Sequence, residues 1–239
     1  MLKWIGVGLG ILFGITVAML VKASSAAKKP TYQLKAMDEN QAQKFTPSWT
    51  DEDFKKLNSI AVGNRMNPAD LLLILTSESG LNPKAVNRRS DGFPIAVGLN
   101  QLTTAANGLV GISEDERVDI PNQSVNYQLD LVNRFFSGLQ WTKAGKSYDN
   151  AGVIYEANFA PGRMTSRGTS LDAVLYDTGD GVSYTQNKQL DKDGKGKITV
   201  GDLVEYMRTV SDKAVYNAAL QRMRAVTGDE SLAPTLPTS

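Results

Sequence analysis

The stretch NPADLLLILTSESGLNP, residues 67–83, decides the fold of this chain. Asn67 is a typical N-cap residue, Pro68 suits the first helical turn, and Gly80 is typical of a helix C-terminus. The apolar residues between them form an almost unbroken run. The stretch therefore predicts a buried helix that begins at Pro68 and ends at Gly80.

Glu78 lies in the last turn of this expected helix. Leu71, Leu75 and Glu78 are spaced so that they share one helical face. A carboxyl there would be partly desolvated and would feel the negative end of the helix dipole, and both effects favour its protonated form. Such a group can act as a general acid near neutral pH. The alternative is a solvated Glu at a helix end.

Further helices are expected along the chain. One begins after the cap pair Thr50 and Asp53, a second covers 124–137, a third covers 149–158, and a fourth covers 200–226 with a break near Ser211. Alternating strand patterns are nearly absent, so the fold class is mainly α.

The composition excludes several mechanisms, because the chain has no Cys and no His. Nucleophiles activated by His, zinc sites built from His and Cys, and disulfides are impossible. Glycoside cleavage needs only carboxylates. The net charge of +1 and the lack of long basic runs give no reason to expect nucleic acid as a partner.

The N-terminus predicts a membrane anchor over residues 1–22. Residues 4–21 are uncharged, and a helix of this length spans roughly 27 Å, close to the hydrocarbon thickness of a bilayer. A signal peptide is the alternative, since KASSAA follows. Gly6, Gly10 and Gly14 line one helical face, which indicates either a homo-oligomeric contact or only the frequency of Gly in membrane helices.

Three segments occur in order along the chain: SESGLNPKAV (77–86), AVGLNQLTTAA (96–106) and YEANFAPGRM (155–164). Together they resemble the soluble lytic transglycosylase family of the lysozyme superfamily. Glu78 and Ser79 match its first motif, Gln101 its second, and Asn158 its third. The resemblance covers roughly residues 50–165.

This resemblance implies a mainly α, lysozyme-like fold of the goose-type or lytic-transglycosylase kind, and the uncharged run at the N-terminus adds a transmembrane helix to it. The expected organisation is an anchor at 1–22, a polar linker at 23–47, a catalytic domain at 48–227, and a flexible tail at 228–239. The expected partner is peptidoglycan, and no cofactor is required.

The resemblance also implies roles for the site residues. Glu78 protonates the bond between N-acetylmuramic acid (MurNAc) and N-acetylglucosamine (GlcNAc), and then removes a proton as a 1,6-anhydro ring closes. Ser79, Gln101, Asn158 and Tyr155 are expected to bind the substrate. The alternatives are local ones: a helix-end cap for Ser79, a turn residue for Gln101, and a helix cap for Asn158.

Two positions depart from the family pattern. Asn100 replaces the usual Met before the Gln, and Ala157 replaces a Tyr whose hydroxyl is expected to lie near the catalytic Glu. Tyr155 lies two residues earlier and does not share the helical face of Ala157.

Two alternatives to a lytic transglycosylase remain open. One is a hydrolytic muramidase on the same fold. The other is a non-catalytic structural or channel protein of a virion that binds peptidoglycan, which Ala157 and the Gly-spaced anchor favour. The third motif is most similar to lysozyme-like domains of phage virion proteins. The expected location is therefore a bacterial envelope or a phage virion, with the chain held at a membrane and acting on the wall.

The segment DKDGKGKITVGD, residues 191–202, resembles a calcium-binding loop. Asp191, Asp193 and Asp202 occupy ligand positions, but Lys195 stands where a further ligand is usual, and Asp replaces the terminal Glu. A Gly-rich turn in which Thr199 and Asp202 cap the next helix is the competing interpretation. Calcium is a weak expectation.

Overall fold

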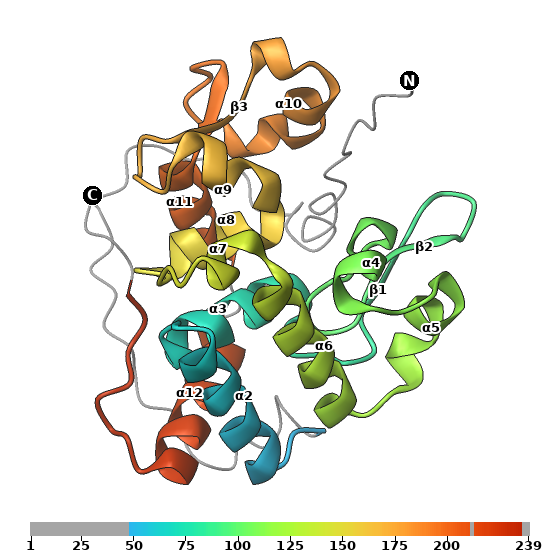
Figure 1. Cartoon of the computed structure of the whole chain (residues 1–239), viewed down its shortest axis with the longest axis vertical. Helices are drawn as coiled ribbons and strands as arrows, with labels where there is room; N and C mark the ends of the chain where they lie inside the picture. The colour runs from blue at the N-terminus through green and yellow to red at the C-terminus, as the bar shows by residue number, and fades with distance from the viewer. Residues whose placement is uncertain (1–47, 211–212, 236–239) are drawn as a thin grey trace.

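The computed structural model describes residues 48–210 and 213–235. This part of the chain is mainly helical, as predicted, and its elements surround a central helix, α3 (Figure 1). The α-helices are α2 (Asp51–Gly63), α3 (Pro68–Ser79), α4 (Asn107–Val110), α5 (Glu114–Asp119), α6 (Val125–Gly138), α7 (Gln140–Lys143), α8 (Ala151–Phe159), α9 (Pro161–Arg167), α10 (Val182–Asn187), α11 (Val200–Val210) and α12 (Lys213–Thr227).

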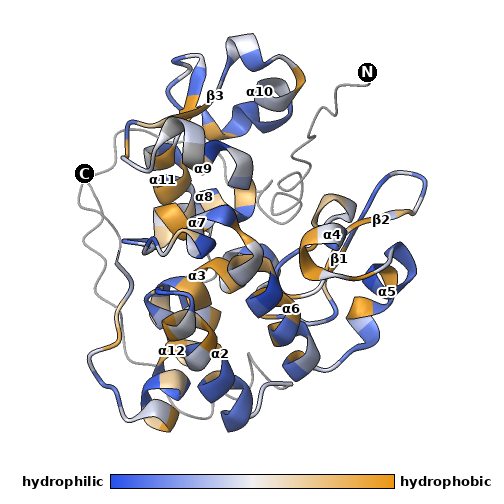
Figure 2. Ribbon diagram, viewed as in Figure 1, coloured by the Kyte–Doolittle hydropathy of each residue, from blue (hydrophilic) through white to orange (hydrophobic). Residues whose placement is uncertain are grey.

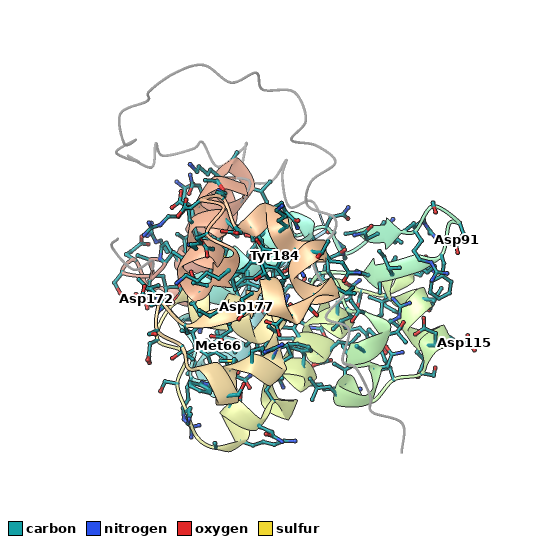
Figure 3. All side chains as sticks on the ribbon, turned by 90° about the horizontal axis from the view of Figure 1, so that it is seen from above. Met66, Asp91, Asp115, Asp172, Asp177 and Tyr184 are labelled. Carbon is teal, nitrogen blue, oxygen red and sulfur yellow. The ribbon has the colours of Figure 1, made fainter. Side chains whose placement is uncertain are left out.

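Two short antiparallel sheets accompany the helices. β1 (Val86–Arg88) pairs with β2 (Pro94–Val97), and β3 (Val174–Asp177) pairs with β4 (Lys197–Thr199). The sequence indicated almost no strands, because elements this short carry too few residues for an alternating pattern. In Figure 3, Asp91 of the β1–β2 loop and Asp115 of α5 lie at one outer edge, away from Asp172.

Helix α3 has the ends that the sequence predicted. The Asn67 side chain accepts a hydrogen bond from the Ala69 amide, and Gly80 ends the helix in the left-handed conformation at φ 61°. Every residue from Pro68 to Thr76 is buried, and α3 packs against α2, α8, α11 and α12. Figure 2 shows α3 as largely hydrophobic, whereas the loop between β1 and β2 is hydrophilic.

The other predicted helices are also confirmed. Thr50 and Asp53 form a reciprocal capping box at the start of α2, and the Ser124 side chain accepts from the Tyr127 amide at the start of α6. Helix α8 begins two residues later than predicted, after the cap residue Asn150. α11 and α12 cover the helix predicted over 200–226, and residues 211–212 between them, where the break near Ser211 was predicted, lie outside the described residues.

Part of the expected tail, residues 228–235, contacts the domain, and its flexibility stays a prediction. Leu232 is 8% exposed, and its carbonyl accepts from the Arg224 guanidinium. The Asn67 amide donates to the Ala233 carbonyl, and the Thr235 amide donates to the Asp70 carboxylate. These contacts fasten the segment to the start of α3, a pairing between distant residues that local composition does not reveal.

The expected anchor, the linker over residues 23–47, and the glycines at positions 6, 10 and 14 lie outside the described residues. Within residues 48–210 and 213–235, no helix is long and apolar enough to cross a membrane.

Candidate active site

Glu78 lies in the last turn of α3, where the buried leucines of that helix end. Its side chain is partly exposed, yet enough protein surrounds the carboxyl that burial raises its pKa to about 8. Burial disfavours the charged form because the carboxylate loses its hydration. Glu78 therefore holds its proton at neutral pH, as a general acid must.

Asn158 contacts this carboxyl directly. Its side-chain Nδ2 donates a hydrogen bond to Glu78 Oε1 at 3.0 Å, which lowers the pKa of Glu78 and partly offsets the effect of burial. The residue comes from the end of α8, which packs against both α3 and α11. The Asn158 amide thus holds the acid, a contact that does not support the alternative of a helix cap. Its substrate contact stays a prediction.

Close packing brings α8 against α11. A Cβ on Gly152 would lie 2.4 Å from the Val204 side chain and 3.4 Å from that of Val200, so only Gly allows this approach. The contact fixes α8 between α11 and α3, and thereby sets where Asn158 meets Glu78.

Tyr155 lies one turn before Asn158 on α8 and is 2% exposed. Its ring stacks on Tyr206, with centroids 6.0 Å apart and the planes 1° apart, and also on Phe159, with centroids 6.4 Å apart. Burial raises the pKa of Tyr155 well above its usual range, and the charge of Glu78 adds to this effect. The structure places Tyr155 beside the acid; its predicted role in substrate binding stays a prediction.

Ser79 and Gln101 both bond to nearby backbone. The Ser79 hydroxyl donates to the Leu75 carbonyl at 3.1 Å, and Gln101 Nε2 donates to the Gly98 carbonyl at 2.9 Å. These contacts agree with the local alternatives, a helix-end cap and a turn residue. Gln101 also has a positive φ of 46°, a conformation that costs a non-Gly residue about 1–2 kcal/mol. Strain of this kind is often found at functional sites.

The turn that carries Gln101 depends on Gln128, which the sequence analysis missed. Gln128 Oε1 accepts from the Leu99 amide at 3.0 Å, and its Nε2 donates to the carbonyls of Pro83 and Ile120, each at 2.9 Å. This buried amide joins the segment after α3 to the turn. A polar residue within the apolar stripe of α6 was the available signal.

Arg117 is a second buried polar residue that the sequence analysis missed. Its guanidinium is fully buried, donates to the Pro94 carbonyl at 2.7 Å, and pairs with Glu114. Hydrogen bonds from Arg117 are the main cause that lowers the pKa of Glu114 to about 2. The pair fastens α5 to β2, the strand that leads into the turn.

Tyr206 of α11 is a further missed residue near the acid. It is 6% exposed, and burial together with the charge of Glu78 raises its pKa to about 12. No local pattern marks Tyr206, because it follows the third motif by more than 40 residues and reaches Glu78 only through the packing of α11.

The carboxylates of the calcium-like loop are held by protein donors. Asp191 accepts from the Tyr184 hydroxyl at 2.6 Å and from the Gly196 amide at 2.8 Å, and the first of these contacts lowers its pKa most. Lys195 Nζ lies 2.8 Å from an oxygen of Asp202 and 3.7 Å from one of Asp193.

Asp202 has a second partner at the start of α11. Its other oxygen accepts from the amide and hydroxyl of Thr199, which is the capping pair expected as the competing interpretation. In the described part of the chain, no three residues of the Asp, Glu, His and Cys types are grouped for a metal ion. The weak expectation of calcium stays untested.

Comparison with known proteins identifies the domain. Residues 57–158 match the family model described as the Transglycosylase SLT domain, whereas no curated protein and no solved structure matches the chain. The match includes Glu78, Gln101 and Asn158, and ends before Tyr206. It indicates transglycosylase-type cleavage of the glycan strands of peptidoglycan, and hence action on the cell wall. The part of the chain built around Glu78 therefore matches a transglycosylase SLT domain, in agreement with the predicted resemblance to the soluble lytic transglycosylase family.

Proposed function

We propose that this chain is a lytic transglycosylase that cleaves the β-1,4 bond between MurNAc and GlcNAc and releases 1,6-anhydromuropeptides. The observation that carries the proposal is the state of Glu78. Burial raises its pKa to about 8, and the Asn158 amide bonds one carboxyl oxygen at 3.0 Å. The other oxygen is then the one that carries the transferable proton.

The first step uses Glu78 as an acid. The carboxyl gives its proton to the glycosidic oxygen as the bond from that oxygen to C1 of MurNAc breaks, and GlcNAc leaves with a new hydroxyl. The 2-acetamido group of MurNAc assists at C1, a recognised replacement for an enzymic nucleophile. Between the steps Glu78 is ionised, and the Asn158 amide stabilises that charge.

The second step restores the enzyme. Ionised Glu78 removes the proton from the C6 hydroxyl of MurNAc while that oxygen bonds to C1 and the bond from the acetamido oxygen to C1 breaks, which closes the 1,6-anhydro ring and restores the acetamido group. Glu78 ends protonated, as it began, and no water is consumed. One carboxyl therefore serves both steps.

The surroundings of Glu78 favour a mechanism with one carboxyl. Two acids a few Å apart raise one another's pKa, as in sites with paired carboxylates. Among the described residues, burial and Asn158 account for the shift of the Glu78 pKa, with no contribution from a second carboxyl.

Product analysis tests this proposal. The purified full-length chain and its Glu78→Gln variant are incubated with peptidoglycan, and the soluble products are identified by mass spectrometry. Wild type should release 1,6-anhydromuropeptides, and the variant should be slower by about 10²–10⁴-fold, the usual contribution of general acid–base catalysis. Glu52→Gln is the matched control, because its side chain is 75% exposed on α2.

Each alternative gives a different result. Products with a reducing MurNAc end would identify a hydrolytic muramidase. Binding to peptidoglycan without release of products would support a non-catalytic virion protein, which Ala157 favours. Lysis by Glu78→Gln at the wild-type rate would refute the role of Glu78.

We further propose that residues 4–21 hold the enzyme at a membrane, in a phage virion or a bacterial envelope. The uncharged run supports this location. N-terminal sequencing of the mature protein tests it. A start near residues 24–28 would mean that a signal peptide is removed and the anchor is lost.

A further inference from the structure

The third motif of this chain lacks a hydroxyl. Ala157 takes the position where the family resemblance implies a Tyr, and it is fully buried. Its neighbour Asn158 bonds Glu78, so the backbone of the motif is in place. The catalytic carboxyl therefore lacks the donor that a Tyr at position 157 is expected to supply.

A pair of tyrosines, one from α8 and one from α11, lies near the Glu78 carboxyl. Tyr155 and Asn158 are three residues apart on α8, which puts them on one helical face. Tyr206 of α11 stacks in parallel on Tyr155, with centroids 6.0 Å apart, and α11 also packs against α3, which carries Glu78. Glu78, Asn158 and the two tyrosines thus form one cluster from three helices.

The electrostatics of this cluster agree with its geometry. Burial raises the pKa of Tyr155 and that of Tyr206, and the charge of Glu78 raises both further, so both phenols lie within range of the carboxyl. Because the pKa of Tyr206 is raised to about 12, its hydroxyl stays protonated at any working pH and can only act as a neutral donor or acceptor.

We propose that Tyr206 is the positioning residue of Glu78, and that its hydroxyl donates a hydrogen bond to the ionised carboxylate formed between the two proton transfers. The proposal rests on the proposed function. It makes α11, which lies beyond the matched residues 57–158, a part of the active site.

Tyr206 suits this role better than Tyr155. The ring of Tyr155 packs between Phe159 and Tyr206 and is 2% exposed, so it has little freedom to turn. Tyr206 stacks on Tyr155 and is 6% exposed. Like that of Tyr155, the Tyr206 hydroxyl makes no hydrogen bond within the described residues, so a bond to the ionised Glu78 carboxylate would replace none.

The first test measures the titration of Glu78 and does not depend on activity. The full-length chain is labelled with ¹³C at the glutamate side chains, and the Glu78 signal is assigned by its loss in Glu78→Gln. Tyr206→Phe keeps the ring and removes the hydroxyl. Loss of a donor to the ionised form should strengthen proton binding by Glu78 about tenfold, which raises its pKa by about one unit. Tyr127→Phe, on α6, is the matched control and should leave the titration unchanged.

The second test measures the reaction. Tyr206→Phe should lower kcat on peptidoglycan by roughly 10- to 100-fold with KM nearly unchanged, because the lost bond stabilises a state formed during turnover. The alkaline limb of the pH–rate profile should move to higher pH with the pKa of Glu78. A merely structural role would lower the melting temperature without moving that limb.

The outcomes separate this proposal from the proposed function. An unchanged Glu78 titration in Tyr206→Phe would overturn the role of Tyr206, and so would a shift seen only in Tyr155→Phe. If wild type releases no 1,6-anhydro products, the proposed reaction fails, while the titration still decides whether Tyr206 is the donor to Glu78.

Discussion

Replacing Glu78 by Gln should stabilise the folded chain at neutral pH. Gln has nearly the same shape and can still accept the Asn158 hydrogen bond, but it cannot ionise. The pKa of Glu78 is raised from its usual 4.5 to about 8 in the folded state. Between these values the folded chain retains a proton that the unfolded chain has released, so the stability of wild type falls as the pH rises through this window.

The size of the effect follows from the same pKa. The stability of wild type begins to fall at pH 4.5, and pH 7 lies 2.5 pH units above that value. Because each unit corresponds to about 1.4 kcal/mol, the raised pKa of Glu78 lowers the free energy of unfolding at pH 7 by about 3 kcal/mol. Glu78 is partly exposed, and water reaching the carboxyl makes this an upper value. We expect Glu78→Gln to unfold with a free energy about 2–3 kcal/mol higher than wild type at pH 7.

Urea unfolding of the full-length chain, followed by circular dichroism, measures this difference. Two other buried carboxyls have raised pKa values, Asp70 at about 7 and Glu156 at about 8, and both make wild type less stable as the pH rises. They are present in both proteins, so the difference between the proteins isolates Glu78. The difference should be small near pH 5 and grow towards pH 8. A difference that stays constant over this range would refute a raised pKa at Glu78.

Two further predictions concern the stability contributed by residues other than Glu78, namely Asp202 and Gly98. Asp202→Ala should lower stability by about 1 kcal/mol through loss of the α11 cap, and EDTA should leave the melting temperature unchanged. A rise in melting temperature with calcium in wild type, absent in Asp191→Ala, would instead identify an ion site. Gly98→Ala should cost about 2 kcal/mol or more in urea unfolding, because φ is +72° and a Cβ would lie 2.6 Å from two side-chain atoms. Gly92→Ala is its control, with φ +86° and no atom within 4 Å, and should cost about 1 kcal/mol; equal losses for the two variants would contradict the steric part of this argument.

The helix that carries Glu78 could be predicted from residues 67–83 because its signals are local. A capping side chain bonds a backbone amide two or three residues along the chain, and the apolar residues of one helical face recur within two turns. The Asn67 cap, the Gly80 terminus and the Thr50–Asp53 box are therefore found where the sequence indicated them. The same holds for the Thr199–Asp202 pair at α11.

Contacts between distant segments could not be predicted in this way. Gln128 and Arg117 were missed because most of their partners are backbone groups of other elements; the sequence marks Gln128 only as a polar residue in an apolar stripe and does not show what it bonds. The contacts of Leu232 and Thr235 with the domain were not predicted for a related reason, since the polar composition of residues 228–239 does not reveal them.

The sequence by itself determined Glu78 as the candidate acid of this protein, and the tertiary structure alone decided what surrounds it. Glu78 follows from one segment, because a carboxyl in the last turn of an apolar helix is expected to be partly desolvated. Its neighbours come from α8 and α11, and α11 is placed by the close contact at Gly152. Packing of this kind depends on the shapes of whole helices, so the approach of Asn158 and Tyr206 to Glu78 exists only once the chain has folded.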